Sequence, residues 1–430
     1  MSVMTSMTAP AQMLTRYRGA RRRTLELCEP LTPEDMMVQS TPEASPAKWH
    51  LAHTAWFFES FILREFLPGY KLFHPDFSWL FNSYYRSFAA FPQKSLRASF
   101  ARPGLEEVLR YRAHVDEAME KLLEGNPEPE VLARTELGVN HEEQHQELLL
   151  TDILNAFFTN PLRPAYVQDA QAETVCAVVD PIRYVEFAGG LRDTGHGGEG
   201  FCFDNERPRH KVWLEPYALA DRLVTNREFV EFIEDGSYQR PELWLSAGWD
   251  VVEEQGWDAP LYWSREGDGW SLFTLRGARP LTSMAAAPVS HVSYFEADAY
   301  ARWAGKRLAT EFEWEAAAER LAVEGNLLDS GKLLPSPAQP PVQEHCTAQQ
   351  FGDCWEWTAS AYLGYPGFAP LAGSLGEYNG KFMSGQMVLR GGSCVTPRAH
   401  IRASYRNFFA PETRWQFSGI RLAEQMRHHQ

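Results

Sequence analysis

The sequence predicts an α+β protein in two parts, a bundle of four helices over residues 1–165 and a mixed α/β part over residues 182–430, joined by a linker at 166–181. At 430 residues the chain is longer than one ordinary core requires. Apolar residues recur at helical spacing in the first part. After Tyr166 glycine, proline and tryptophan become frequent, and short β-like runs replace the long helical ones.

Four stretches of the first part have a helical pattern. Their expected ranges are Leu14–Leu27, Ser45–Phe66, Gly104–Leu123 and Thr135–Phe158. Ser45 is expected to cap the second helix, with Pro46 in its first turn. A loop rich in aromatic residues, Phe73–Phe100, follows that helix. Four such helices are typical of a bundle.

The second part is expected to contain long loops and only short helices. Long loops in compact domains tend to be functional, and Ala188–Phe203 and Gly325–Glu344 are two such segments. The expected helices are Asn226–Glu234, Tyr294–Ala304 and Glu311–Ala322.

Composition excludes several classes of protein. A 44% hydrophobic content argues against global disorder, and a formal net charge of -15 without a basic stripe argues against a nucleic-acid partner. No apolar run reaches about 18 residues, so no membrane span is expected. The six cysteines form no CxxC pair and no dense disulfide framework. We therefore expect a cytoplasmic protein with no obligatory protein partner.

The segment HEEQH places His141 and His145 four residues apart on a predicted helix. This spacing puts both imidazoles on one face, where they can hold two positions on one metal ion. The earlier segment WHLAH offers a third ligand in His50 or His53, and spacing does not separate the two. A pair of hydrogen-bonded core histidines without a metal is the alternative.

The letters HEEQH also match the zinc-protease pattern, with Glu142 as general base. No further ligand signature follows on the same helix, and a second histidine-bearing helix precedes it, so we do not favour a protease. Three imidazoles without a carboxylate would leave about half of an octahedral iron's positions open. Tyr84 and Tyr85 are either core aromatics or, beside a metal, donors of a proton or an electron.

Several segments together resemble a known family. The segments SPAKWHLAHTAWFFESF, FNSYY and NHEEQHQELL resemble the DinB-like domain of the ergothioneine-biosynthesis sulfoxide synthases, the EgtB family. The second part resembles the formylglycine-generating-enzyme-like (sulfatase-modifying, C-type-lectin-like) domain of the same family, through FDNERPRHKVWLEPYALADRLVTNREFVEFI, GDCWEWTAS, LRGGSCVTP and IRASYRNFF. The segments occur in the family's order over nearly all of residues 12–424.

The resemblance implies a non-heme iron(II) oxygenase. Such an enzyme joins the thiol of cysteine to the imidazole C2 of hercynine (Nα-trimethylhistidine), with dioxygen, and forms hercynylcysteine S-oxide. By this resemblance His53, His141 and His145 are the iron ligands, while His50 is not a ligand. The expected roles of four further residues follow the same resemblance: Gln144 hydrogen-bonds the hercynine imidazole, and Asn407, Phe408 and Tyr365 line the ammonium and carboxylate end of hercynine.

The sulfur donor is inferred from a few positions. Lys94 and Arg97 lie where the family has a basic pair for the donor's carboxylate. Members that use γ-glutamylcysteine have an acidic residue shortly after the RN motif, where this chain has Phe409. The pair Tyr84 and Tyr85 resembles the tyrosines of the cysteine-using branch. We therefore expect free cysteine, with γ-glutamylcysteine as the alternative donor.

Three other functions fit the sequence less well. A formylglycine-generating oxidase needs a close pair of late cysteines, which Cys346, Cys354 and Cys394 do not provide. A non-catalytic binding module has no need for three histidines with Gln144. A DinB-type thiol transferase with another divalent metal does not account for the fused second part.

Overall fold

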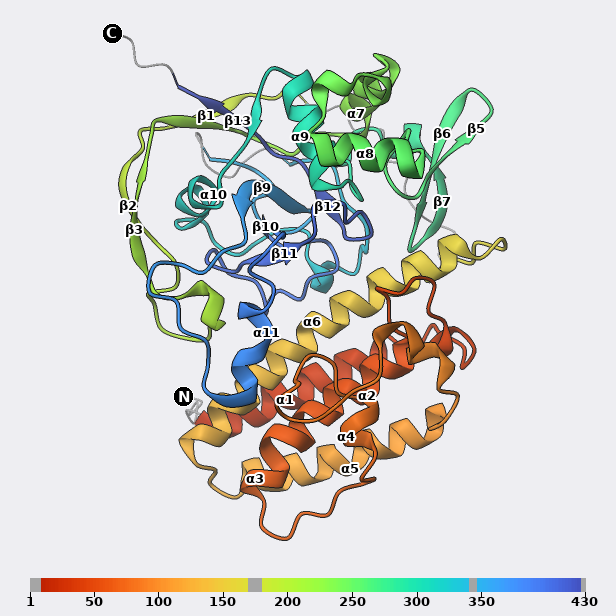
Figure 1. Cartoon of the computed structure of the whole chain (residues 1–430), viewed down its shortest axis with the longest axis vertical. Helices are drawn as coiled ribbons and strands as arrows, with labels where there is room; N and C mark the ends of the chain where they lie inside the picture. Colours follow the sequence, from red (N-terminus) through yellow and green to blue (C-terminus); the bar gives the residue numbers. More distant parts are fainter. Residues whose placement is uncertain (1–8, 169–179, 340–345, 427–430) are drawn as a thin grey trace, which may run out of the picture. The chain divides into compact units, whose positions relative to one another are not determined.

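A computed structural model of the chain describes residues 9–168, 180–339 and 346–426 (Figure 1). These residues form two compact units. The first contains residues up to Asn160 together with Leu371–Tyr378, and the second contains Pro161–Pro370 and the chain from Asn379. Most of the expected linker, and Cys176 within it, lies outside the described residues. Each unit is described separately below.

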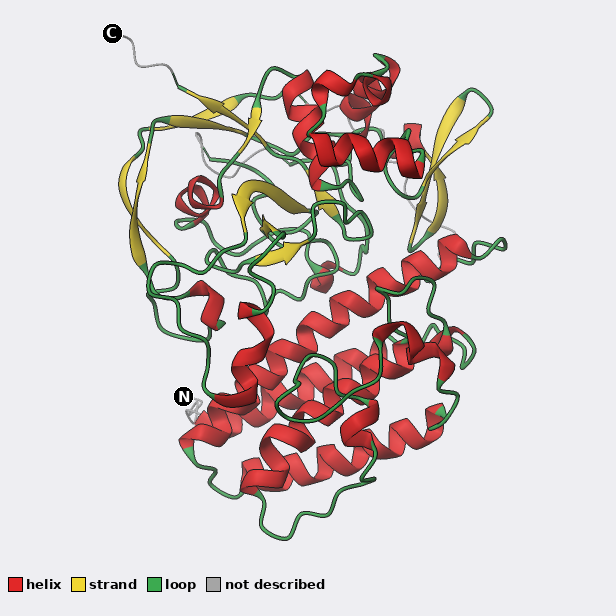
Figure 2. Cartoon of the chain, in the orientation of Figure 1, coloured by secondary structure: helices red, strands yellow, loops and turns green. Residues whose placement is uncertain are grey.

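The first unit is the predicted four-helix bundle (Figure 2). Its long helices are α1 (Ala9–Glu26), α2 (Ala47–Phe58), α5 (Leu105–Glu124) and α6 (Pro129–Thr159). A π-helical segment, Glu59–Leu63, carries α2 into the short α3 (Arg64–Phe66), so the helical stretch ends at Phe66 as expected. The aromatic loop contains α4 (Phe77–Leu80) and a 3₁₀ turn, Lys94–Ser99.

Every residue of α2 is buried, which makes this helix the centre of the bundle. It packs against α5 and α6, and α1 packs against α6 and α5. The polar side chains that α2 carries must therefore find partners inside the protein, because a buried polar group without a hydrogen bond is costly. His50 and His53 are two of these side chains.

Several boundaries of this unit differ from the expectation, and α1 begins at Ala9, five residues before the expected Leu14. Ser45 does not cap α2: the helix starts at Ala47 after Pro46, and the Ser45 hydroxyl accepts a hydrogen bond from Arg97 Nη1 at 2.7 Å. A long-range partner has thus replaced the local cap. Helix α6 begins at Pro129, six residues before the expected Thr135, with proline in its first turn. Of the added residues 129–134 only Val131 is buried, so they contribute too few core positions to extend the apolar pattern.

The second unit is built on small sheets (Figure 2). One antiparallel sheet has the order β1-β4-β13-β8, and another has the order β11-β10-β9-β12, in which β12 runs parallel to β9. A two-stranded sheet pairs β2 with β3, and a three-stranded sheet has the order β5-β6-β7. The strand bounds are β1 Tyr184–Phe187, β2 Gly190–Thr194, β3 His210–Leu214, β4 Tyr217–Ala220, β5 Trp263–Glu266, β6 Gly269–Thr274, β7 Gly277–Pro280, β8 Arg307–Leu308, β9 Trp355–Ala361, β10 Met387–Arg390, β11 Asn407–Phe409, β12 Ser418–Gly419 and β13 Leu422–Gln425.

The three short helices expected in this unit are present as α7 (Asn226–Glu234), α9 (Tyr294–Trp303) and α10 (Glu311–Ala318). Helix α10 ends four residues before the expected Ala322. Each begins with a capping box, in which a serine or threonine hydroxyl and a glutamate three residues later satisfy each other's backbone N–H groups. Helix α8 (Ser246–Gln255) was not expected, because only Gly248 and Val252 of it are buried and its apolar pattern is weak. The mixed α+β architecture is confirmed.

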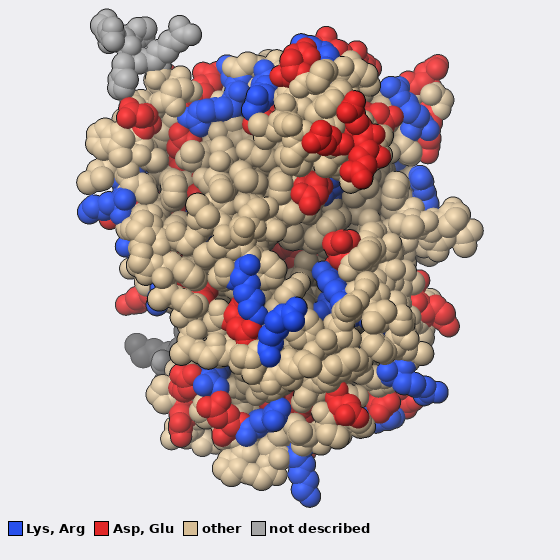
Figure 3. Space-filling model, in the orientation of Figure 1, with Lys and Arg blue, Asp and Glu red and all other residues tan. Residues whose placement is uncertain are grey.

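No helix of the described part is both long and apolar enough to span a bilayer. On the face drawn in Figure 3, lysine and arginine side chains are interspersed with acidic ones and form no continuous stripe.

Candidate metal centre

Three histidines meet inside the helical unit. His53 comes from α2, and His141 and His145 come from successive turns of α6. The three are buried, and one ring nitrogen of each lies within 4.8 Å of the others. The Nε2 atoms of His53 and His141 are 3.2 Å apart. The structure therefore brings together the three histidines that the sequence analysis singled out.

Contacts on the far sides of two rings determine which nitrogen faces the cluster. His53 Nδ1 lies 2.6 Å from the backbone carbonyl oxygen of Phe81, which can only accept, so this nitrogen carries the proton. The Nε2 lone pair of His53 then faces the cluster. His145 Nδ1 lies 2.8 Å from Nδ1 of His50. His50 is thus outside the cluster but in direct contact with one of its members.

Electrostatics keeps the three imidazoles neutral. Burial lowers the pKa of His141 to about 4. Burial, followed by the neighbouring histidines, lowers the pKa values of His53 and His145 well below the ordinary value. Neutral imidazoles carry the lone pair that metal binding needs.

This donor set fits a transition-metal ion. Three converging neutral nitrogen donors suit a divalent iron, zinc or copper ion better than magnesium or calcium, which prefer oxygen. The carboxylate nearest in sequence, Glu142, lies elsewhere: it accepts hydrogen bonds from Arg21, Arg112 and Thr24 at 2.7–3.0 Å. Burial would raise the pKa of Glu142, but the two guanidinium groups lower it to about 2. Glu142 is therefore part of a buried ionic cluster and not a base at the metal centre.

The two tyrosines of the aromatic loop have different surroundings. Tyr85 is 4% exposed and packs among aromatic rings, at 5.0 Å from Phe61 and 5.7 Å from Trp56. Tyr84 is half-buried, and its ring contacts Tyr378 edge to face at 5.7 Å. The Tyr84 phenol is also close enough to Arg97 to act on the pKa of that guanidinium.

Arg97 is a buried cation beside the histidines. Its guanidinium stacks on the ring of Trp49 at 3.4 Å and donates to the hydroxyls of Ser45 and Ser83, both at 2.7 Å. Trp49 in turn stacks on His53 at 4.4 Å. Burial lowers the pKa of Arg97 to about 10. Among the residues that the structure describes, no carboxylate forms an ion pair with Arg97, so a carboxylate ligand would satisfy it.

The remaining predicted residues divide between the units. In the helical unit, Lys94 begins the 3₁₀ turn that ends at Ser99, and Gln144 is half-buried immediately before His145. In the second unit, Asn407 and Phe408 lie on β11. The ring of Phe408 stacks on Tyr362 at 4.0 Å, and its backbone N–H donates to Asn407 Oδ1 at 2.9 Å.

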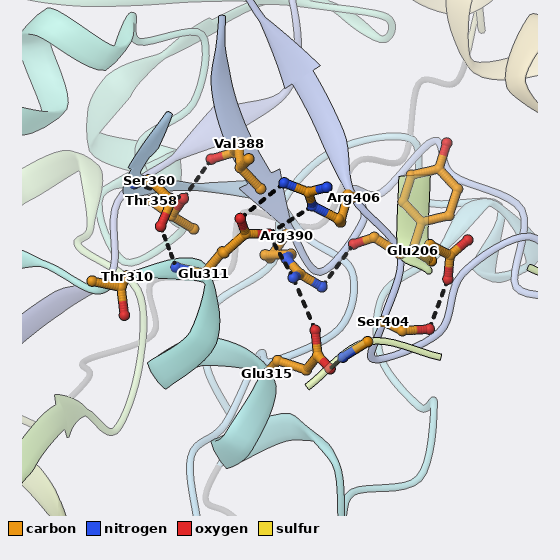
Figure 4. A network of polar contacts seen from close by, with 12 residues as sticks. Glu206, Thr310, Glu311, Glu315, Thr358, Ser360, Val388, Arg390, Ser404 and Arg406 are labelled. Carbon is orange, nitrogen blue, oxygen red and sulfur yellow. Dashed lines mark hydrogen bonds and ion pairs between the residues drawn. The ribbon is translucent and has the colours of Figure 1, made fainter. Parts of the chain in front are cut away.

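Tyr365 belongs to a buried ionic network of the second unit, part of which Figure 4 shows around Glu311. Arg390 and Arg406 both donate to the Glu311 carboxylate, at 2.8 Å. The Tyr365 hydroxyl donates to the same carboxylate at 3.2 Å and accepts from Arg390 at 3.1 Å. These contacts hold the phenol within the domain core, and its expected role towards hercynine stays a prediction.

Three residues near the centre were not found from the sequence. Asp152 lies 3.0 Å from His50 Nε2, and its position seven residues after His145 could have revealed it, because that spacing is two helical turns. Glu377 and Tyr378 contact the loop that carries Tyr84, although almost 300 residues separate them in sequence. No local pattern predicts such a contact.

Comparisons with known proteins agree with this organisation. Residues 16–149 match the DinB superfamily, and residues 177–336 and 335–426 match the sulfatase-modifying factor enzyme 1-like domain. Hercynine oxygenase of Mycobacterium tuberculosis is 34% identical over 97% of this chain and 99% of its own length. Hercynine oxygenase of Mycolicibacterium smegmatis is 32% identical over 94% of this chain and 96% of its own.

A third relative covers less of the chain. The formylglycine-generating enzyme of Streptomyces coelicolor is 40% identical, but over 28% of this chain and 41% of its own length. The full-length matches include both the helical unit with its three histidines and the second unit. The chain therefore belongs to the hercynine oxygenase family.

Proposed function

We propose that the protein is an iron(II)-dependent sulfoxide synthase of ergothioneine biosynthesis. It joins L-cysteine to C2 of the hercynine imidazole and yields hercynylcysteine S-oxide. One oxygen atom of dioxygen goes to sulfur, and the other leaves as water with the hydrogens of the imidazole C2–H and the thiol. The observation that carries the proposal is the neutral, buried cluster of three histidines in a chain that matches hercynine oxygenases over nearly its full length.

His53, His141 and His145 would hold the iron. Three nitrogen ligands leave about half of an octahedral coordination sphere for substrates. Bound iron(II) would lower the pKa of the cysteine thiol and activate dioxygen. Aromatic rings surround the centre, with Trp49 stacked on His53 at 4.4 Å and Phe57 4.7 Å from His141. These rings exclude water from the side of the histidines that faces the bundle.

Arg97 is proposed to bind the carboxylate of the sulfur donor, with Lys94 as the second cation. Its guanidinium is held in place by Ser45, Ser83 and the Trp49 ring, and it lacks a carboxylate partner within the described residues. A preorganised arginine binds a planar carboxylate strongly and directionally.

Tyr84 is the better candidate of the two tyrosines for proton donation. The half-buried Tyr84 is close to Arg97, whereas Tyr85 is enclosed by the aromatic rings of the bundle core. A phenol holds its proton at Oη at neutral pH and can release it to reduced oxygen during turnover. Tyr84 and Arg97 both belong to the aromatic loop Phe73–Phe100, so this one loop would supply both the proton and the cation for the donor's carboxylate.

Gln144 and the residues of β11 are proposed to bind hercynine. Gln144 would hydrogen-bond the imidazole ring, since its amide can both donate and accept. Phe408 is partly exposed and stacks on the buried Tyr362, so it offers a ring face that attracts a quaternary ammonium group, and Asn407 adds a polar group.

Free cysteine is the proposed donor. Phe409 packs edge-on against Trp415 at 5.0 Å, so this position offers no carboxylate to pair with the additional ammonium group of γ-glutamylcysteine. Equal or higher kcat/KM with γ-glutamylcysteine would contradict this assignment and leave the rest of the proposal intact.

Oxygen consumption tests the function. Anaerobically purified protein is loaded with iron(II) and mixed with hercynine and cysteine in aerated buffer. We expect oxygen uptake that requires both substrates, and no uptake by the variants H53A, H141A and H145A. The H74A variant is the matched control, because His74 is exposed and lies outside the cluster. Uptake that is independent of hercynine would contradict the proposal.

A further inference from the structure

A carboxylate and a histidine stand behind one of the three clustered histidines. Asp152 Oδ2 lies 3.0 Å from Nε2 of His50, and Nδ1 of His50 lies 2.8 Å from Nδ1 of His145. Asp152 follows His145 by two turns on α6, and His50 precedes His53 by one turn on α2. The two central helices thus supply an unbroken chain, Asp152–His50–His145, that ends at the cluster.

Asp152 is itself fixed. Its Oδ2 atom accepts a hydrogen bond from the backbone N–H of Ser45 at 2.8 Å, just before α2 begins. An ionised carboxylate only accepts hydrogen bonds, so the contact with His50 Nε2 requires the proton to be on that nitrogen. In a neutral His50 ring, Nδ1 then has the lone pair and accepts.

The direction of the next contact follows from this. His145 Nδ1 must donate its proton to His50 Nδ1, and this tautomer leaves the lone pair of His145 on Nε2. If His50 were reversed or charged, its Nδ1–H would point at His145 Nδ1, and His145 would have to carry its own proton on Nε2. A proton there blocks metal binding. The hydrogen bonds from Asp152 through His50 to His145 therefore select the tautomer of His145 whose Nε2 can bind a metal.

The three histidines differ in this support. His53 donates to the Phe81 carbonyl, and His145 donates to the Asp152–His50 pair. His141 Nδ1 is buried and has no hydrogen-bond partner among the described residues. The charged support is thus directed at His145 alone.

We propose that His50 and Asp152 are positioning residues that fix His145 in its metal-binding tautomer and orientation. The inference rests on the metal centre of the proposed function and extends it to two residues outside the three proposed ligands. Hydrogen bonds of this kind typically contribute about 10- to 100-fold to metal affinity.

Metal affinity measured by competition with a chelator tests the inference apart from catalysis. We expect H50F, which keeps a planar aromatic ring but has no nitrogen, to bind cobalt(II) about 10- to 100-fold more weakly than the wild type. H50Q should recover part of the loss, because an amide offers an acceptor for His145 and a donor for Asp152. H400F is the matched control, since His400 is a buried histidine hydrogen-bonded to Tyr405 in the second unit, and it should bind as the wild type does.

A second readout separates positioning from general loosening. In the cobalt(II)-loaded protein, the exchangeable N–H protons of ligated imidazoles give shifted proton resonances. The Nδ1–H proton of His145 should exchange faster with solvent in H50F and in D152A, while the exchange of the His53 proton stays unchanged. If H50F does not fold, D152A carries the test, because the Asp152 side chain is 13% exposed and that of His50 is 2% exposed, so truncation at Asp152 disturbs the packing less.

The outcomes are distinct. Wild-type affinity and unchanged N–H exchange in the folded H50F or D152A variant would overturn the inference while leaving the metal centre in place. A wild-type protein that binds no divalent metal would overturn the proposed function itself. Three results together support the inference: weaker cobalt(II) binding by H50F, partial recovery of affinity in H50Q, and wild-type affinity in H400F.

Discussion

The carboxylate of Glu377 accepts a hydrogen bond from the backbone N–H of Ser87 at 2.9 Å, across 290 residues of sequence. The same carboxylate accepts from the N–H of Arg86 at 3.2 Å and from the Ser87 hydroxyl. Tyr378, the next residue, contacts Tyr84 at 5.7 Å. A segment encoded late in the chain thus holds the loop to which we assign proton donation.

Removing this carboxylate should loosen the loop. In E377A the N–H groups of Arg86 and Ser87 lose their acceptor, at a cost of about 1 kcal/mol, so their hydrogen exchange should accelerate about fivefold. Hydrogen–deuterium exchange measured by mass spectrometry on peptides that span Tyr84–Phe88 reads this directly. E43A, at an exposed position of the same unit, should leave those peptides unchanged. Equal protection in E377A and wild type would contradict the assigned contact.

The two tyrosines should respond differently to loss of the hydroxyl. Y84F should lower sulfoxide formation by about 10²- to 10⁴-fold, the range typical of a general acid, and direct turnover towards oxidation of the thiol. Y85F should change the rate far less, because its packing against Phe61 and Trp56 needs only the ring. Product ratios measured by mass spectrometry decide the point, and the reverse pattern would assign the role to Tyr85.

Substitution of Glu142 should lower the free energy of unfolding and leave metal binding in the folded protein unchanged. E142Q leaves the buried Arg21 and Arg112 without their shared carboxylate, and breaking such a buried pair costs about 3–5 kcal/mol. Urea denaturation of the metal-free protein measures the loss. E136Q on the same helix removes a partly exposed pair with Arg16 and should cost at most about 1 kcal/mol. A stable E142Q that binds no metal would instead favour a role at the centre.

His291 should make the second unit sensitive to acid. Burial lowers the pKa of His291 to about 3, against about 6.5 in an unfolded chain. Between these values the unfolded state binds more protons, so the free energy of unfolding should fall as the pH falls from about 6.5 towards 3. H291N should show a shallower fall, since asparagine tolerates the backbone φ of 63° at this position. Parallel slopes in urea denaturation at pH 7, 6, 5 and 4 would refute this.

Local patterns predicted the elements better than the contacts between them. Helical periodicity gave the four bundle helices, and the HxxxH spacing gave the facing pair His141 and His145, because both depend on residues within one or two turns. Ser45 was wrongly expected to cap α2, since its hydroxyl is taken by Arg97, 52 residues away in sequence.

The supporting residues of the centre were harder to predict for the same reason. Spacing alone could not separate His50 from His53. All of α2 is buried, so no exposed side of the helix shows which of the two histidines points into the core. Their different roles depend on α6, which places Asp152 behind one ring and His141 in front of the other. Glu377 could not be found at all without the fold.

The mass of the product formed in one competition reaction tests the central claim most directly. Iron-loaded protein receives hercynine, dioxygen, and equal concentrations of cysteine and γ-glutamylcysteine. The three-histidine centre and the apolar Phe409 predict hercynylcysteine S-oxide as the main product, with its oxygen label derived from ¹⁸O₂. A main product that retains the γ-glutamyl group would contradict the donor assignment, and the absence of any compound containing both hercynine and sulfur would contradict the proposed function.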